Sequence, residues 1–257
     1  MSRVDRPAAD TAVRTFETMG TVVSLRGADA PTALAVRDVF VAYDRRYSLY
    51  DPDSALSRIA AGTLRLAAAP QDVRDTYALA LDWRERTHGA FTPHRPDGVL
   101  DLSGVVKALA IRDAGAVLDA VSRAGSADWM LAVGGDVLAS GTQGDDPWQV
   151  GVVDPLDRTR VVGVVPLGDD RRAVATSGTA ERGEHVWRRA EPVFRQVTVV
   201  ASDIVTADVL ATAVLAGDEH DLASVTEHGS VDVLAFGVDG RVWATPGASA
   251  YVTAAAA

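Results

Sequence analysis

The stretch WMLAVGGDVLASG, residues 129–141, contains two strand-like apolar runs separated by Gly134, Gly135 and Asp136. Glycines between two such runs predict a tight hairpin turn, and they also allow backbone to lie against a flat ligand. Further strand-like runs follow with no helical pattern between them: WQVGVVDP (148–155), RVVGVVPL (160–167), RAVATSGTA (172–180) and FRQVTVVAS (194–202). This part of the chain therefore predicts neighbouring strands rather than alternation of strands and helices.

The sequence before this stretch is mainly helical in pattern. RTFETMGTVVSLRGA (14–28) alternates in strand fashion up to about Arg26. Apolar spacing and capping residues then predict helices within PTALAVRDVFVAYDRRYSLY (31–50), DPDSALSRIAAG (51–62) and PQDVRDTYALALDWRERTHG (70–89). A longer helix is predicted from about Gly104 to Ala124, with this buried stripe: Val105, Val106, Leu109, Val117, Leu118 and Val121.

After the strands, a helix is predicted from Ile204 to Ala216 and ends at Gly217. A second helix around residues 219–229 precedes a strand pair with Asp239-Gly240 as its turn. The order of helices first and adjacent strands later predicts an α+β fold. No repeat or linker divides the chain, so we expect a flexible arm over residues 1–14 and one domain over residues 15–257.

Composition narrows the class of protein. The 257 residues are 47% hydrophobic and 23% charged, which is typical of a soluble globular protein. The net charge of −10 argues against a nucleic acid as the main partner, and the absence of cysteine excludes disulfides and thiolate metal sites. We find no apolar run long enough for a membrane span or a signal peptide, so the simplest expectation is a cytoplasmic protein without membrane insertion.

The stretch DLSGVVKALA, residues 101–110, contains the only lysine, Lys107, in a chain whose other basic residues are arginines. Asp101, Ser103 and Gly104 precede it at a predicted helix start. The free N–H groups of a helix N-terminus and a compact ammonium in its first turn suit a phosphate. An ordinary capped helix, with a lysine retained by chance, is the alternative.

A second pattern lies in TADVLATAVLAG, residues 206–217, where Asp208 and Thr212 are four positions apart and share one helical face. They interrupt a run of small and apolar residues. A carboxylate and a hydroxyl form a pair of hard oxygen ligands suited to Mg²⁺, which also accepts phosphate oxygens. A mildly polar helix edge would give the same pattern. In VATSGTAERGEHVW (174–187), Ser177 to Thr179 end a strand and His185 follows, although a lone histidine is more often a packing or surface residue.

Taken in order, the motifs ETMGT, YSLYDPDSALSRI, GAFTP, DLSGVVKALA, VGGD, VATSGT and DVLATAV resemble the FAD:protein FMN transferase family, often called ApbE. The resemblance runs from about Phe16 to beyond Gly217. It implies a single α+β domain with a mostly antiparallel sheet packed against helices. It also implies Mg²⁺-dependent transfer of FMN from FAD to a threonine or serine hydroxyl of an acceptor protein, with release of AMP.

The resemblance assigns roles to residues by motif. Flavin-nucleotide contacts fall on the following positions: Met19, Tyr50, Ala90, Phe91, Thr92, Asp101, Lys107, Gly134, Gly135 and Asp136. Gly104, through its backbone carbonyl, and the Asp208–Thr212 pair would hold the metal. Lys107 would lie beside the diphosphate, and His185 would assist deprotonation of the attacking hydroxyl.

Two other functions remain open for the same sequence. One is a Mg²⁺-dependent FAD pyrophosphatase that gives FMN and AMP at the same site. The other is a flavin-binding protein without catalysis, because the family's HIIDP motif is altered here to HVWRRAEP.

Overall fold

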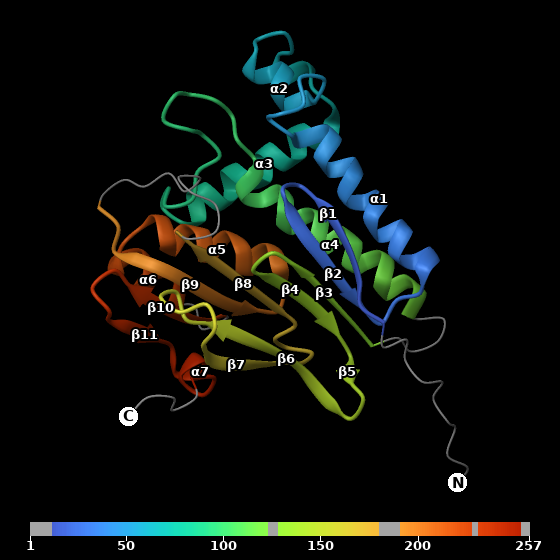
Figure 1. Ribbon diagram of the computed structural model, residues 1–257. Coiled ribbons are helices and arrows are strands. Elements are labelled where there is room, and N and C mark those ends of the chain that lie inside the picture. Colours follow the sequence, from blue (N-terminus) through green and yellow to red (C-terminus); the bar gives the residue numbers. More distant parts are fainter. Residues whose placement is uncertain (1–11, 123–127, 180–190, 228–230, 253–257) are drawn as a thin grey trace.

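The structure is a computed structural model that describes residues 12–122, 128–179, 191–227 and 231–252 (Figure 1). The first half of the chain contains these elements: β1 (Arg14–Thr18), β2 (Thr21–Arg26), α1 (Ala30–Tyr47), α2 (Ala55–Ala60), the 3-10 helix η1 (Leu66–Ala68), α3 (Gln71–Arg86), α4 (Ser103–Ser122), β3 (Trp129–Val133) and β4 (Asp136–Ser140). The second half contains these: β5 (Thr142–Gln143), β6 (Asp146–Val153), β7 (Val161–Leu167), β8 (Ala173–Gly178), β9 (Phe194–Ala201), α5 (Ile204–Ala216), α6 (Glu219–Thr226), β10 (Asp232–Gly237), β11 (Val242–Ala244) and α7 (Pro246–Ser249).

The strands of the described residues form two sheets. The large sheet has eight strands in the order β1-β2-β3-β4-β8-β9-β10-β11, and the small sheet has the order β5-β6-β7. Every neighbouring pair in both sheets is antiparallel. The antiparallel α+β fold predicted from the resemblance is therefore confirmed.

The two sheets and the helices form layers. Helices α1, α3, α4 and α5 lie on one side of the large sheet, and the small sheet lies on the other side (Figure 1). The main core fills the space between helices and large sheet, where Phe40, Trp129 and Phe194 are fully buried. A smaller core lies on the opposite face and includes Trp148 and Leu167 of the small sheet.

Local sequence explains where the helices begin. Asp29 caps α1 by accepting a hydrogen bond from the backbone N–H of Thr32, and Asp203 caps α5 in the same way through Thr206. Helix α5 matches its predicted bounds because Asp203 starts it and Gly217 ends it. Most of its residues are buried, since it packs against β8, β9 and α4.

The strand pattern predicted up to about Arg26 is confirmed, but it did not include a turn that divides it. Residues 14–26 form a hairpin and not one strand, because the chain reverses at Met19 and Gly20, both with positive φ (48° and 69°). Two successive positive-φ residues define the two-residue turn that matches the twist of a hairpin. Alternation continues through such a turn, so the period-2 pattern alone did not reveal it.

Two further predictions have clear outcomes. The Gly134-Gly135 step is a tight turn between β3 and β4, as predicted, with Val133 paired to Asp136. Val121 is wrong as a buried residue of α4: it lies in the last turn of the helix and is 51% exposed. The predicted arm over residues 1–14 lies mostly outside the described residues, and β1 already includes Arg14.

Candidate active site

Several predicted residues gather at one edge of the large sheet. The turn at Met19-Gly20 and the turn at Gly134-Gly135 lie close together there, because β2 and β3 are antiparallel and the Gly134 N–H donates to the Val22 carbonyl at 3.2 Å. The end of β8 reaches the same edge, where the backbone N–H of Thr176 donates to Asp136 Oδ1 at 3.3 Å. The antiparallel topology thus unites segments that are far apart in sequence.

Lys107 lies between two buried carboxylates at this edge. Its ammonium pairs with Asp136 Oδ2 and lies 3.3 Å from Asp208 Oδ1. The side chain of Lys107 is 12% exposed, that of Asp208 5% and that of Asp136 fully buried. Buried charges require partners, and this cluster brings together one residue each from α4, β4 and α5.

The Asp208 carboxylate is only partly satisfied. Within the described part of the chain its Oδ2 atom is buried and has no hydrogen-bond partner. Buried polar atoms nearly always have partners, so an exception of this kind indicates a place for a ligand, ion or water. In the same part of the chain, Asp136 Oδ2 is also buried without a hydrogen bond, but it forms the ion pair with Lys107, whereas Asp208 meets Lys107 through Oδ1 and leaves Oδ2 for a bound cation.

Thr212 lies one turn further along α5 and contacts the end of β8. Its Oγ1 is 3.2 Å from the hydroxyl of Ser177. The predicted pairing of Asp208 and Thr212 on one helical face, and the VATSGT motif at a strand end, therefore meet in one place. The oxygen atoms of this group are hard ligands of the kind that Mg²⁺ takes in proteins.

The donor set fits a metal of the Mg²⁺ type, although it is sparse. Among the described residues we find no group of three or more His, Asp or Glu side chains that could hold a metal ion. Mg²⁺ is typically bound through one or two carboxylates, waters and substrate phosphates rather than by a complete protein cage. One carboxylate with a bare oxygen and one nearby hydroxyl therefore suit such an ion better than a zinc-type site, and the start of α4 suits the phosphates that would complete its coordination.

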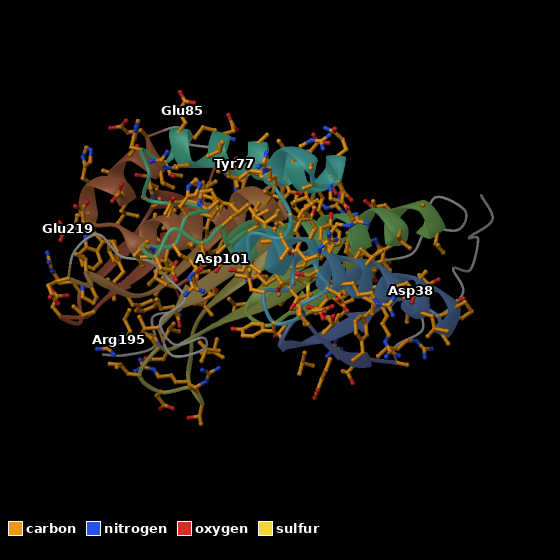
Figure 2. The ribbon with its side chains drawn as sticks, turned by 90° about the horizontal axis from the view of Figure 1, so that it is seen from above. Asp38, Tyr77, Glu85, Asp101, Arg195 and Glu219 are labelled. Carbon is orange, nitrogen blue, oxygen red and sulfur yellow. The ribbon has the colours of Figure 1, made fainter. Side chains whose placement is uncertain are left out.

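The start of α4 is held by a neighbouring motif. The ring of Phe91 lies so close to Gly104 that a Cβ there would come within 2.8 Å of the ring. Asp101 Oδ1 accepts a hydrogen bond from the backbone N–H of Ser103 at 2.9 Å, and the Asp101 N–H donates to the Pro93 carbonyl. GAFTP and DLSGVVKALA thus pack against each other, and Figure 2 shows Asp101 over the middle of the molecule in that view.

The remaining predicted residues differ in their surroundings. Ala90 and Phe91 are buried, Thr92 is half-buried and accepts a hydrogen bond from the His94 N–H, and Tyr50 is 88% exposed. His185 lies outside the described residues. The structure joins Lys107, Asp136 and Asp208 directly and leaves Tyr50 as an exposed aromatic residue on the loop before α2.

The contact between Lys107 and Asp136 was not predicted from the sequence. The two residues were assigned to flavin-nucleotide contacts by separate motifs, with no reason to pair them. A lone lysine and an aspartate beside a glycine turn were the available signals. Neither signal specifies a partner, since the pairing depends on how α4 crosses the β3–β4 hairpin.

A cleft of about 420 Å³ lies between α1, α3 and α4, and the residues that line it include Tyr43, Arg46 and Asp113. Burial, together with the hydrogen bond that Tyr43 donates to Asp113 at 2.6 Å, raises the pKa of Tyr43 above its usual value. Arg46 pairs with Asp72 there. Its charged groups pair with one another, and we assign it no function.

Comparison with known proteins identifies the family. The sequence profile of the ApbE family matches residues 19–95 and 93–235. The chain belongs to the ApbE family. The matched residues include Met19, Lys107, Asp136 and Asp208.

One curated relative and several solved structures are similar to this ApbE chain. A Rhodobacter capsulatus protein named FAD:protein FMN transferase is 34% identical over 160 residues, which cover 57% of this chain and 30% of that protein. The match therefore spans less than a third of the relative's length.

The solved structures match over nearly the whole chain and support the fold. The ApbE protein of Thermotoga maritima has a TM-score of 0.76 at 20% identity, over 94% of this chain and 99% of its own. The flavin transferase ApbE of Vibrio cholerae has a TM-score of 0.73 at 22% identity, over 95% and 100%. The Pseudomonas stutzeri flavinyl transferase ApbE has 0.74 at 17%, over 97% and 100%. The expected family and fold are confirmed.

Within the part of the chain that the structure describes, every helix is too short or too polar to span a bilayer. The cytoplasmic location stays a prediction from the sequence.

Proposed function

We propose that this ApbE protein transfers FMN from FAD to a threonine or serine hydroxyl of an acceptor protein in a Mg²⁺-dependent reaction that releases AMP. The observation that carries the proposal is the buried Lys107–Asp136–Asp208 cluster, in which Asp208 keeps an unpartnered oxygen. The name of the Rhodobacter capsulatus relative supports the same activity.

The residues have distinct roles in this proposal. Asp208, Thr212 and the backbone carbonyl of Gly104 would hold Mg²⁺, which when bound neutralises phosphate charge and polarises phosphorus. The Lys107 ammonium would bind the diphosphate as a point charge at the start of α4, where helix N–H groups also favour an anion. Further contacts with FAD would come from Met19, Tyr50, the segment Ala90 to Thr92, Asp101 and the turn from Gly134 to Asp136.

The chemical step needs little covalent work from the protein. The acceptor oxygen attacks the flavin-side phosphorus of the diphosphate. The bond between that phosphorus and the bridging oxygen breaks, and AMP leaves with the bridging oxygen. The hydroxyl proton must be removed, and we assign this task to His185. Positioning and charge stabilisation by Lys107 and Asp208 then supply most of the rate enhancement.

Mass spectrometry of a candidate flavoprotein domain tests the proposal. The domain is incubated with the full chain, FAD and Mg²⁺, and we expect a mass increase equal to one covalently bound FMN together with an equal amount of AMP. Asp208→Ala should prevent both products. Asp157→Asn, which removes an exposed carboxylate from the turn between β6 and β7, is the matched control and should leave them unchanged.

The same experiment separates the alternatives. AMP and free FMN formed from FAD without an acceptor would indicate a pyrophosphatase. Binding of FAD with no AMP under any condition would indicate a flavin-binding protein without catalysis, and the transferase proposal would then be wrong.

A further inference from the structure

Lys107 has more anionic partners than a phosphate-binding lysine requires. Its ammonium contacts Asp136 and Asp208 at the same time, and both carboxylates are nine-tenths buried or more. Of these two, Asp208 is the residue to which the proposed function assigns the metal. In this structure a side-chain cation therefore stands beside the carboxylate that a divalent cation would use.

The two carboxylates are not equivalent partners. Asp136 begins β4 and its Oδ1 accepts the Thr176 N–H, so its position is fixed by the sheet. Asp208 lies on α5, and within the described residues its Oδ2 has no hydrogen-bond partner. Asp136 is thus built as a permanent counter-ion, while Asp208 is built with a free ligand position.

A lysine and a divalent cation on one buried carboxylate repel each other strongly, because the water that would screen them is excluded. Resting on the proposed function, we propose that Lys107 and the divalent cation compete for Asp208, and that Asp136 is the positioning residue that retains the displaced ammonium. Metal entry then releases Lys107 from Asp208 without sending it into solvent. The ammonium stays paired with Asp136 at the start of α4, where the diphosphate is expected.

The inference predicts opposite effects of two neighbouring charges on metal affinity. Lys107→Met removes the competitor and should tighten binding of Mn²⁺, used as the probe in place of Mg²⁺, by about tenfold or more. Asp136→Asn removes the retaining carboxylate, so that the ammonium is held more firmly by Asp208. This variant should weaken Mn²⁺ binding by about tenfold.

The double variant distinguishes action through the lysine from direct action on the metal. If Asp136 acts by holding Lys107, then adding Asp136→Asn to Lys107→Met should change Mn²⁺ affinity by less than about twofold. If Asp136 instead binds the metal or attracts it by its own charge, the loss should be the same in both backgrounds. That second result would overturn the role given to Asp136.

The experiment measures free Mn²⁺ by electron paramagnetic resonance on the full chain, with neither FAD nor acceptor present. Arg241→Met removes one positive charge from an exposed side chain far along the sequence and serves as the matched control, with no change expected. The proposed competition would be overturned if the Lys107 variants bound Mn²⁺ with the affinity of the wild type. It would also be overturned if neither the wild type nor the variants bound Mn²⁺.

A second variant and a second measurement test the inference if Lys107→Met fails to fold. Lys107→Gln keeps a polar group between the carboxylates and should also tighten Mn²⁺ binding. In thermal unfolding, Mn²⁺ should raise the melting temperature of either Lys107 variant more than that of the wild type, because a ligand stabilises the state it binds.

Asp208→Ala separates failure of the inference from failure of the proposed function. Loss of Mn²⁺ binding in Asp208→Ala, together with unchanged binding in Lys107→Met, would overturn only the competition. Wild-type Mn²⁺ binding in Asp208→Ala would show that the metal site itself is wrongly assigned.

Discussion

Two carboxylate clusters lie on opposite faces of the large sheet and differ in how completely they are satisfied. On the face of the smaller core, Asp232 accepts hydrogen bonds from Arg171 (3.2 Å) and Tyr251 (3.0 Å) at Oδ2 and from Thr245 (3.4 Å) at Oδ1. On the helical face, Asp208 has Lys107 on one oxygen, and its other oxygen has no partner among the described residues.

The number of carboxylate oxygens with partners indicates which cluster stabilises the fold and which is suited to binding. A carboxylate whose two oxygens both accept hydrogen bonds contributes to stability. It also has no bare oxygen left for a ligand. A buried carboxylate with one bare oxygen costs stability and is retained where a ligand completes it. The Asp232 cluster therefore fastens α7 and the chain after it to the sheet, whereas the Asp208 cluster is suited to binding.

The largest effect is expected for Asp208→Ala. Transfer of FMN should fall by at least about 1,000-fold, because the metal loses its carboxylate ligand. The free energy of unfolding should change by less than about 1 kcal/mol, since Lys107 keeps Asp136 and an unsatisfied buried group is removed. AMP release and urea unfolding measure the two quantities. Activity within tenfold of wild type would contradict the metal assignment.

Asp232→Ala should lower stability and leave metal binding unchanged, which is the reverse of the effect expected for Asp208→Ala. It leaves Arg171, Tyr251 and Thr245 without their acceptor and should lower the free energy of unfolding by about 2–3 kcal/mol. Mn²⁺ affinity of the folded protein should not change. Asp232→Asn, which keeps one acceptor oxygen, is the control and should lose less. A loss below about 0.5 kcal/mol for the alanine variant would remove the contrast between the clusters.

Replacing Lys107 by arginine keeps the positive charge and tests whether the shape of the charged group matters. Lys107→Arg should lower kcat/KM by about tenfold, because a wide guanidinium does not fit where a compact ammonium contacts two carboxylates. Steady-state AMP release measures this. The matched exchange in the other cluster, Arg171→Lys, should leave kcat/KM unchanged. Equal kinetics for wild type and Lys107→Arg would show that the lysine has no special role.

The smallest effect concerns alkaline pH. Burial, and then the hydrogen bond to Asp232, raise the pKa of Tyr251 above its ordinary value of 10.0. A tyrosine with a raised folded-state pKa contributes stability below about pH 10 that is lost as pH rises through the folded pKa. Tyr251→Phe should therefore show a shallower decline in stability above pH 10 in urea unfolding. Parallel pH profiles for the two proteins would contradict this coupling.

The sequence predicted local structure well where local signals are strong. Helix α5 has a cap at Asp203 and a glycine at its end, and its bounds were predicted as observed. The hairpin at Met19-Gly20 was missed, because its strands alternate on both sides of a turn that lacks the usual Asn-Gly or Asp-Gly signal. Val121 was placed on the buried face by spacing, although it is exposed in the last turn of α4, because spacing does not reveal where the packing along a helix face ends.

The sequence by itself determined the α+β class, the family and the residue types that bear chemistry: one lysine at a helix start, and an aspartate and a threonine on one face of an apolar helix. These follow from short-range periodicity, capping and motif order. Only the tertiary structure decided that Lys107 contacts both Asp136 and Asp208 and that one oxygen of Asp208 stays bare within the described residues. The physical reason is that these contacts join α4, β4 and α5, whose relative placement is set by strand order and core packing rather than by local propensity.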